Sequence, residues 1–167
     1  MTSRPLDRGL KDGLVAALRH EALACPARGL ELVVYALGRP LPELNLNTGA
    51  RMPFHATFDP GVDSPHWFVL DRAIIGARGL ALVGPPPAEA LVPPSAEQVL
   101  EALAIGLQWY RDRPDEPRDD AALNAVRTRA YVERGAWLSK AEAVELLLDE
   151  VSASVESRRT RPPDRDR

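Results

Sequence analysis

The stretch Leu30-Glu31-Leu32-Val33-Val34-Tyr35 decides the fold, because a single carboxylate interrupts an apolar run that contains β-branched residues. Such residues favour β-strands, and Pro and Gly within 25–29 and 38–40 bound the run on both sides. Side chains alternate along a strand, so Glu31 shares a face with Val33 and Tyr35. The sequence therefore predicts a strand over 30–35, central or subcentral in its sheet, whose carboxylate is solvated on an edge, paired or functional.

The residues on either side of this strand predict a helix before it and a hairpin after it. Over 10–23 apolar side chains recur at helical spacing, which indicates a helix that packs on the strand. Over 44–47 and 52–58 two extended segments flank the turn sequence Asn47-Thr48-Gly49. Helix and strands in this order predict an α+β fold, with a mixed sheet and flanking helices.

Further helices follow the hairpin. Ser64 and Pro65 open a helix that Gly79 ends, and in it Asp71 and Arg72 form a local ion pair or line a cleft. The segment 80–83 is a short strand or an extended piece that a Gly-Pro-Pro-Pro run ends. A capping box over 95–98 then opens another helix, with apolar side chains on one face.

A charged, proline-punctuated loop over 111–120 marks the boundary before a helical hairpin. Asp120 caps a helix that ends at Gly135, and a second capping box over 139–142 opens the last helix. The predicted organisation is an α/β domain over 1–112, a helical domain over 118–152 and a disordered, Arg- and Pro-rich tail over 153–167.

Composition excludes several classes of protein. The 167 residues are 45% hydrophobic and 27% charged, and no apolar run approaches the roughly 20 residues of a membrane span. The N-terminus lacks the apolar segment of a signal peptide, so we expect a cytoplasmic protein without a membrane partner. The net charge of −3 argues against a nucleic-acid partner. Cys25 is the single cysteine, which excludes an internal disulfide.

The informative features of the sequence are these strands, the Gly-Pro turn at Gly84, the helix with Arg127 that stops at Gly135 and the Ser139-Lys140 helix start. In this order they resemble the aminoglycoside adenylyltransferases that modify streptomycin and spectinomycin. The resemblance runs from about residue 10 to about residue 148 and covers the later part of such an enzyme. It implies a remnant of a nucleotidyltransferase sheet followed by a truncated C-terminal helical domain.

The resemblance also implies roles for three residues. Glu31 corresponds to the third carboxylate of a metal-dependent active site, the catalytic residue that activates the drug hydroxyl. Arg127 and Lys140 correspond to cofactor-binding positions that help to enclose nucleotide and drug; ordinary helix packing and solvation are the alternatives. The complete family uses ATP and Mg²⁺, so the expected ligands are a nucleotide and an aminoglycoside.

The chain also departs from this pattern. It contains no Gly-Ser pair, and its one Asp-x-Asp sequence is Asp164-Arg165-Asp166 in the tail. Two-metal nucleotidyl transfer needs carboxylates that bridge both ions, which Glu31 alone does not supply. We therefore expect a chain that begins in the middle of a catalytic domain, holds no cofactor or metal of its own and is inactive alone.

Two other functions are open at the level of the sequence. The first is a binding module that holds a nucleotide, a drug or a partner without chemistry. The second is a homodimer in which a second copy covers an exposed sheet edge. His55 and His66 either carry chemistry or have an ordinary place in packing or at the surface. The sequence shows no Ser/Asp arrangement around either residue.

Overall fold

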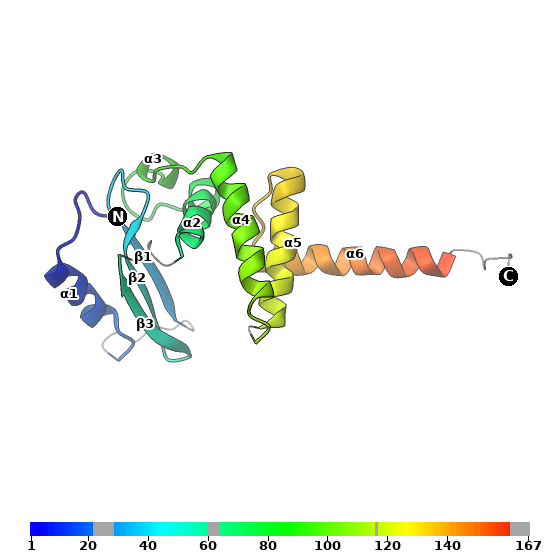
Figure 1. Ribbon diagram of the computed structural model, residues 1–167, viewed down its shortest axis with the longest axis horizontal. Helices are drawn as coiled ribbons and strands as arrows, with labels where there is room; N and C mark the ends of the chain where they lie inside the picture. Colours follow the sequence, from blue (N-terminus) through cyan, green and yellow to red (C-terminus); the bar gives the residue numbers. More distant parts are fainter. Residues whose placement is uncertain (22–28, 60–63, 116, 161–167) are drawn as a thin grey trace. The chain divides into compact units, whose positions relative to one another are not determined.

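The computed structural model describes residues 1–21, 29–59, 64–115 and 117–160 (Figure 1). In these residues the chain forms three strands in one antiparallel sheet and six helices, so the predicted α+β class is confirmed. The chain divides into two compact units: Met1–Leu103, here called the sheet unit, and Ala104–Arg167, here called the helical unit.

The sheet has the strand order β1 (Leu30–Tyr35), β2 (Pro42–Gly49) and β3 (Met52–Phe58). Both neighbouring pairs are antiparallel, with Leu32 opposite Leu46 and Leu46 opposite Ala56. The predicted strand over 30–35 and the predicted hairpin are both present. β1 nevertheless lies at an edge of the described sheet, so the central or subcentral position predicted for it is wrong for the residues described. In the part of the chain that the structure describes, the only other pairing at this edge is a parallel bridge from Thr2 to Ala36.

The core of the sheet unit lies along β2 and at the end of β1. Leu44 and Leu46 of β2 are fully buried, and Val34 and Tyr35 of β1 are nearly so. α1 (Arg8–Leu18) begins at Asp7, whose carboxylate accepts a hydrogen bond from the backbone N–H of Leu10 at 2.8 Å. α1 ends at Leu18, short of the predicted residue 23, because Arg19 takes an extended conformation; residues 22–28 lie outside those described.

Helices α2 (Pro65–Arg78), α3 (Pro87–Ala90) and α4 (Ala96–Arg111) follow the sheet. α2 has the predicted ends, although the side chain of Ser64 makes no capping hydrogen bond. At the start of α4 the predicted capping box is formed: the Ser95 N–H donates to Gln98 Oε1 at 2.9 Å, and the Gln98 N–H donates to Ser95 Oγ at 3.2 Å. The segment 80–83 is not part of a strand.

The helical unit contains the end of α4 and the helices α5 (Arg118–Arg134) and α6 (Lys140–Thr160). α5 starts before Asp120, which therefore lies in its first turn and is not its cap. Gly135 ends α5 with a φ of 66°, a conformation that glycine adopts without strain. The second capping box is formed by Ser139 and Glu142.

α6 continues to Thr160, so helix occupies 153–160, where the sequence predicted the beginning of a disordered tail. Before this stretch, Glu150 of α6 forms an exposed ion pair with Arg129 of α5. Residues 161–167 lie outside those described. None of the described helices combines the length and the apolar character of a membrane span.

Candidate functional site

Glu31 lies on β1 of the sheet unit with its side chain exposed to solvent. On the same strand face, the Tyr35 hydroxyl donates a long hydrogen bond of 3.5 Å to the backbone oxygen of Phe68 in α2. α2 therefore lies over the face of β1 that carries Glu31. This arrangement brings Asp71, one turn further along α2, within electrostatic reach of Glu31.

Glu31 and Asp71 are two carboxylates that interact electrostatically and have no ion-pair partner within the described residues. Burial, and next the negative charge of Glu31, together raise the pKa of Asp71 from 3.8 to about 6. Burial, and next the charge of Asp71, raise the pKa of the Tyr35 hydroxyl as well. Among the described residues neither carboxylate makes a hydrogen bond or an ion pair. We call Glu31 and Asp71 the carboxylate pair.

Arg72 follows Asp71 directly but does not neutralise it through an ion pair. Its side chain is buried, and its guanidinium donates to the backbone oxygen of Phe68 at 3.2 Å and to that of Val92 at 2.7 Å. Burial lowers the pKa of Arg72, which is the expected direction for a cation removed from water. Of the two roles predicted for Asp71 and Arg72, the local ion pair is thus not formed. Arg72 instead ties the segment before α4 to α2.

The donor set of the sheet unit does not fit a two-metal centre. In the part of the chain that the structure describes, no three His, Cys, Asp or Glu side chains lie together as metal ligands would. The carboxylate pair supplies two acidic groups from two elements, and Asp164 and Asp166 lie outside the described residues. No catalytic step through magnesium is therefore derived for this chain.

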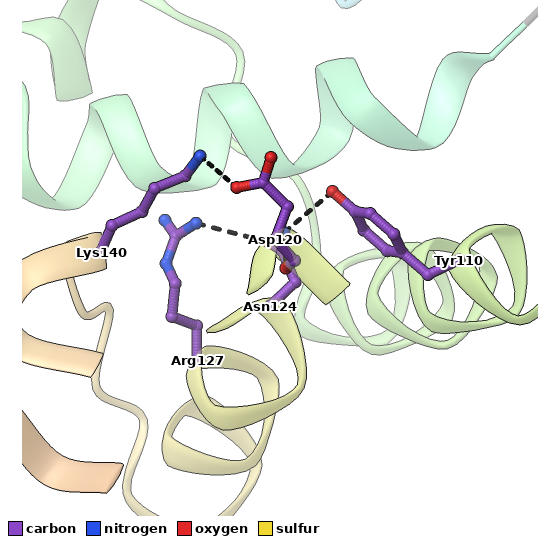
Figure 2. A network of polar contacts seen from close by, with 5 residues as sticks. All are labelled: Tyr110, Asp120, Asn124, Arg127 and Lys140. Atoms are coloured by element: carbon purple, nitrogen blue, oxygen red, sulfur yellow. Dashed lines mark hydrogen bonds and ion pairs between the residues drawn. The ribbon is translucent and has the colours of Figure 1, made fainter. Parts of the chain in front are cut away.

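Arg127 and Lys140 come together in the helical unit, in one network of polar contacts (Figure 2). The Lys140 ammonium contacts Asp120 Oδ1 at 2.6 Å. The Asn124 side-chain amide donates to the Asp120 backbone oxygen at 2.8 Å and to the Tyr110 hydroxyl at 3.0 Å. Arg127 Nη1 donates to Asn124 Oδ1 at 3.4 Å. We call these residues the polar network: Tyr110, Asp120, Asn124, Arg127 and Lys140.

Arg127 and Lys140 differ in how much of each side chain is engaged in contacts within the protein. Arg127 Nε donates to the backbone oxygen of Leu138 at 2.7 Å, so this side chain fastens the connection between α5 and α6. Lys140 occupies the first turn of α6, where the helix dipole disfavours a cation, and Asp120 compensates for that cost. The Lys140 side chain is 62% exposed, which leaves its ammonium accessible to a dissolved anion.

Neither His55 nor His66 belongs to the carboxylate pair or to the polar network. His55 is exposed on β3, and its Nε2 lies 2.6 Å from Thr57 Oγ1. His66 is buried at the start of α2, and burial lowers its pKa, so the ring is neutral near pH 7. Its Nε2 has no hydrogen-bond partner among the described residues. Neither histidine is joined to a carboxylate there.

A cavity of about 400 Å³ opens in the sheet unit. Its two carboxylates are engaged, since Glu43 accepts from the Leu6 N–H at 2.6 Å and Asp59 contacts the Lys11 ammonium at 2.9 Å. The remaining wall is largely apolar and proline-rich; it consists of Pro5, Pro40, Leu41 and Pro42, together with Arg39.

Sequence reasoning missed the residues that surround the predicted ones. Asp71 was considered only with its neighbour Arg72, whereas its electrostatic partner is forty residues away in the chain. Asp120 was assigned a capping role, and Asn124 and Tyr110 were given no role at the site. Helical spacing over 120, 124 and 127 places these residues on one face of α5, and this was the signal available.

The comparisons add no family. No protein-family model matches the chain, and no curated protein matches it. The likeness to the aminoglycoside adenylyltransferases therefore stays a prediction from the sequence.

Proposed function

We propose that the chain is an aminoglycoside nucleotidyltransferase-like protein that binds a nucleotide in its helical unit and transfers no nucleotide by itself. The observation that carries the proposal is the polar network. Arg127 and Lys140, which the resemblance marks as nucleotide contacts, share this network, and Lys140 presents an accessible ammonium at the start of a long helix.

A nucleotide phosphate suits this position for physical reasons. The N-terminus of a helix carries partial positive charge and attracts anions. Lys140 adds a full charge, and a phosphate group can exchange with Asp120 as its partner because both are exposed to solvent to a large extent. Arg127 donates to Asn124 in the same network, and its planar guanidinium suits a second phosphate oxygen.

An aminoglycoside is the proposed ligand of the sheet unit. Aminoglycosides carry several ammonium groups, and the carboxylate pair offers two negative charges without a cationic partner among the described residues. Binding of an ammonium group relieves the repulsion between Glu31 and Asp71, so it is favoured above the pKa of Asp71.

Transfer is a separate step for which this chain lacks the carboxylate pattern. The nucleotidyl group moves between oxygens that two metal ions hold, and an Asp-x-Asp sequence on a strand normally supplies the bridging ligands. The only Asp-x-Asp sequence here is Asp164-Arg165-Asp166, which is surrounded by Arg and Pro residues.

Calorimetric titration with ATP tests nucleotide binding. We expect Lys140→Ala to weaken binding by about tenfold, since a charged contact to phosphate is worth about 1.5–3 kcal/mol. Arg134→Ala is the matched control, because Arg134 is an exposed cation of the same unit outside the polar network. Equal affinity of Lys140→Ala and Arg134→Ala, or no binding by the unaltered chain, would contradict the proposal.

A pyrophosphate-release assay tests the absence of transfer. With ATP, magnesium and streptomycin or spectinomycin, we expect the chain to release no more pyrophosphate than its Glu31→Ala variant. Drug-dependent release above that control would show that the chain is a complete catalyst.

A further inference from the structure

Among the described residues, nothing pairs with most of the sheet edge along β1. Backbone groups of successive strand residues point to opposite sides, and the Tyr35 carbonyl points outward, because it accepts from the Thr2 N–H at 3.0 Å. The same alternation directs the backbone groups of Glu31 and Val33 outward. Thr2 reaches only the end of the strand, so in the described residues nothing pairs with the outer edge over 30–34.

β1 carries few of the devices that usually protect an edge strand, and the irregular register with β2 between Val34 and Tyr35 lies at its end. Natural edges carry lysine, proline or a covering segment. β3, at the other edge of the sheet, contains Pro53, which removes a backbone donor. β1 contains neither proline nor lysine, and Glu31 is its one charge. Its edge is therefore a template on which another strand can add, and the Thr2 bridge shows that it accepts a parallel neighbour.

The segment 80–83, Leu-Ala-Leu-Val, is an apolar segment that is exposed to solvent. Leu80, Leu82 and Val83 are 83%, 89% and 95% exposed, whereas the next most exposed large apolar side chain among the described residues, Val132, is 61% exposed. No backbone hydrogen bond of this segment is formed within the described residues. Its composition suits a strand, although the chain bends at residues 82–85, so pairing as a strand requires residues 82 and 83 to straighten. Gly84, with a φ of 90°, and the prolines after it limit the length of such a strand.

We propose that the segment 80–83 of one copy of this chain adds as a strand to the free edge of β1 in a second copy. Each copy carries both the unpaired edge and the unpaired strand-like segment, and within one copy the two are not paired. Reciprocal addition about a two-fold axis satisfies both edges and closes the assembly as a dimer. The proline run limits the added strand, so pairing does not extend further along the chain.

The segment 80–83 and the free edge of β1 over 30–34 have similar lengths. At about 3.3 Å per residue, the segment 80–83 spans about 13 Å and the free edge over 30–34 about 17 Å. The main-chain hydrogen bonds supply the pairing, and alternate side chains, Leu80 with Leu82 and Ala81 with Val83, pack on the two faces. This proposal concerns the sheet unit and is independent of nucleotide binding by the helical unit.

Mixed cross-linking identifies the partner strand. In a Cys25→Ser background, one preparation carries Glu31→Cys and a tagged second preparation carries Leu82→Cys. With a short bis-maleimide we expect a cross-linked dimer chiefly when the two are mixed. Efficient cross-linking of Glu31→Cys alone would show that β1 pairs with itself and would overturn the proposal, as would the absence of any cross-linked dimer.

Sedimentation analysis measures how much the segment 80–83 and the edge of β1 each contribute to the affinity of the dimer. We expect the unaltered chain to be a dimer, and Leu82→Lys to weaken dimerisation by about tenfold or more, because a charge replaces a buried apolar side chain. Val33→Pro removes an outward N–H and has the same expected effect without loss of pairing to β2. Val132→Lys, an exposed apolar residue in the helical unit, is the control and leaves the dimer intact.

Each outcome of these measurements supports or overturns dimerisation through the segment 80–83. Leu82 is exposed, so Leu82→Lys folds normally even if Val33→Pro does not. A monomeric unaltered chain, or a Leu82→Lys dimer as tight as that of Val132→Lys, would overturn the proposal. Titration of Leu82→Lys with ATP keeps the two proposals apart, since its affinity is expected to equal that of the unaltered chain.

Discussion

The two units treat an aspartate on a helix in opposite ways. In the helical unit, Asp120 lies 2.6 Å from the Lys140 ammonium and its charge is matched. In the sheet unit, Asp71 is buried to a greater extent, meets the like charge of Glu31 and has a pKa raised to about 6. The comparison teaches that the burial of an acidic side chain does not by itself bring a cation beside it. Where a charge is left unmatched, the folded state loses stability and a cationic ligand can restore it.

The largest expected effect comes from Arg72, which supports the sheet unit without pairing with Asp71. Arg72→Ala removes two hydrogen bonds from a buried guanidinium to backbone oxygens. We expect a loss of about 2–4 kcal/mol of unfolding free energy, since two charged bonds are removed and two carbonyls are left without them. Urea unfolding followed by the fluorescence of Trp67, in a Trp109→Phe and Trp137→Phe background, measures it. A loss no larger than that of the exposed-residue control Arg51→Ala would contradict the role of Arg72.

Asp71→Asn sharpens the comparison through pH. The pKa of Asp71 is raised in the folded state, so its contribution to stability is fully present below pH 3.8 and is lost as the pH rises through about 6. The loss amounts to about 2–3 kcal/mol, at about 1.4 kcal/mol per pKa unit. Asp71→Asn abolishes this decline, so it is more stable than the unaltered chain at pH 8. Urea unfolding between pH 4 and pH 8 measures it; parallel profiles for the two proteins would exclude a raised pKa.

In the helical unit, Arg127→Ala tests whether this cation is mainly structural. It removes the hydrogen bond to the Leu138 backbone oxygen that fastens α5 to α6. We expect a loss of about 1–3 kcal/mol, which is the cost of leaving a partly buried polar group without its partner. Fluorescence of Trp137, next to Leu138, reports the unfolding of this unit. If Arg127→Ala is as stable as Arg134→Ala, the hydrogen bond to Leu138 contributes nothing and Arg127 is free to serve a ligand.

The smallest effect is expected from Glu31→Gln. Glu31 is exposed and has no hydrogen-bond partner in the described residues, so its replacement leaves the fold intact and is neutral or slightly stabilising. Removal of its charge also lowers the pKa of Asp71, which carbon-13 NMR of the Asp71 carboxyl measures directly. A loss above about 1.5 kcal/mol at pH 7 would identify Glu31 as a structural partner and contradict this interpretation.

Local signals in the sequence predicted much of the fold. The capping boxes at Ser95 and Ser139 depend on residues three positions apart, and the structure forms both. Strand and hairpin predictions depend on alternation, which is also local. The end of α1 was not predicted, because the change of backbone conformation at Arg19 has no Gly or Pro at that position to signal it. The length of α6 was not predicted either, because the Arg-rich composition after residue 152 was interpreted as a disordered tail.

The candidate site was less predictable, because it depends on contacts between distant residues. Glu31 could be singled out as a lone carboxylate in an apolar run. Its coupling to Asp71 requires that α2 cover one face of β1, which no pattern within either element indicates. The edge position of β1 depends in the same way on what lies beside it, not on its own residues.

The exposed segment 80–83 also has a consequence for proteolysis. Proteases bind their substrates as extended chain, and this segment already has the accessibility that a cleavage site needs. An enzyme that cuts beside leucine therefore meets a site here without prior unfolding, while the prolines that follow resist cleavage. Because the segment precedes Val92, whose backbone oxygen holds Arg72, a nick leaves the two pieces joined by that contact. The rate of cleavage at 80–83 thus reports how often this segment is free.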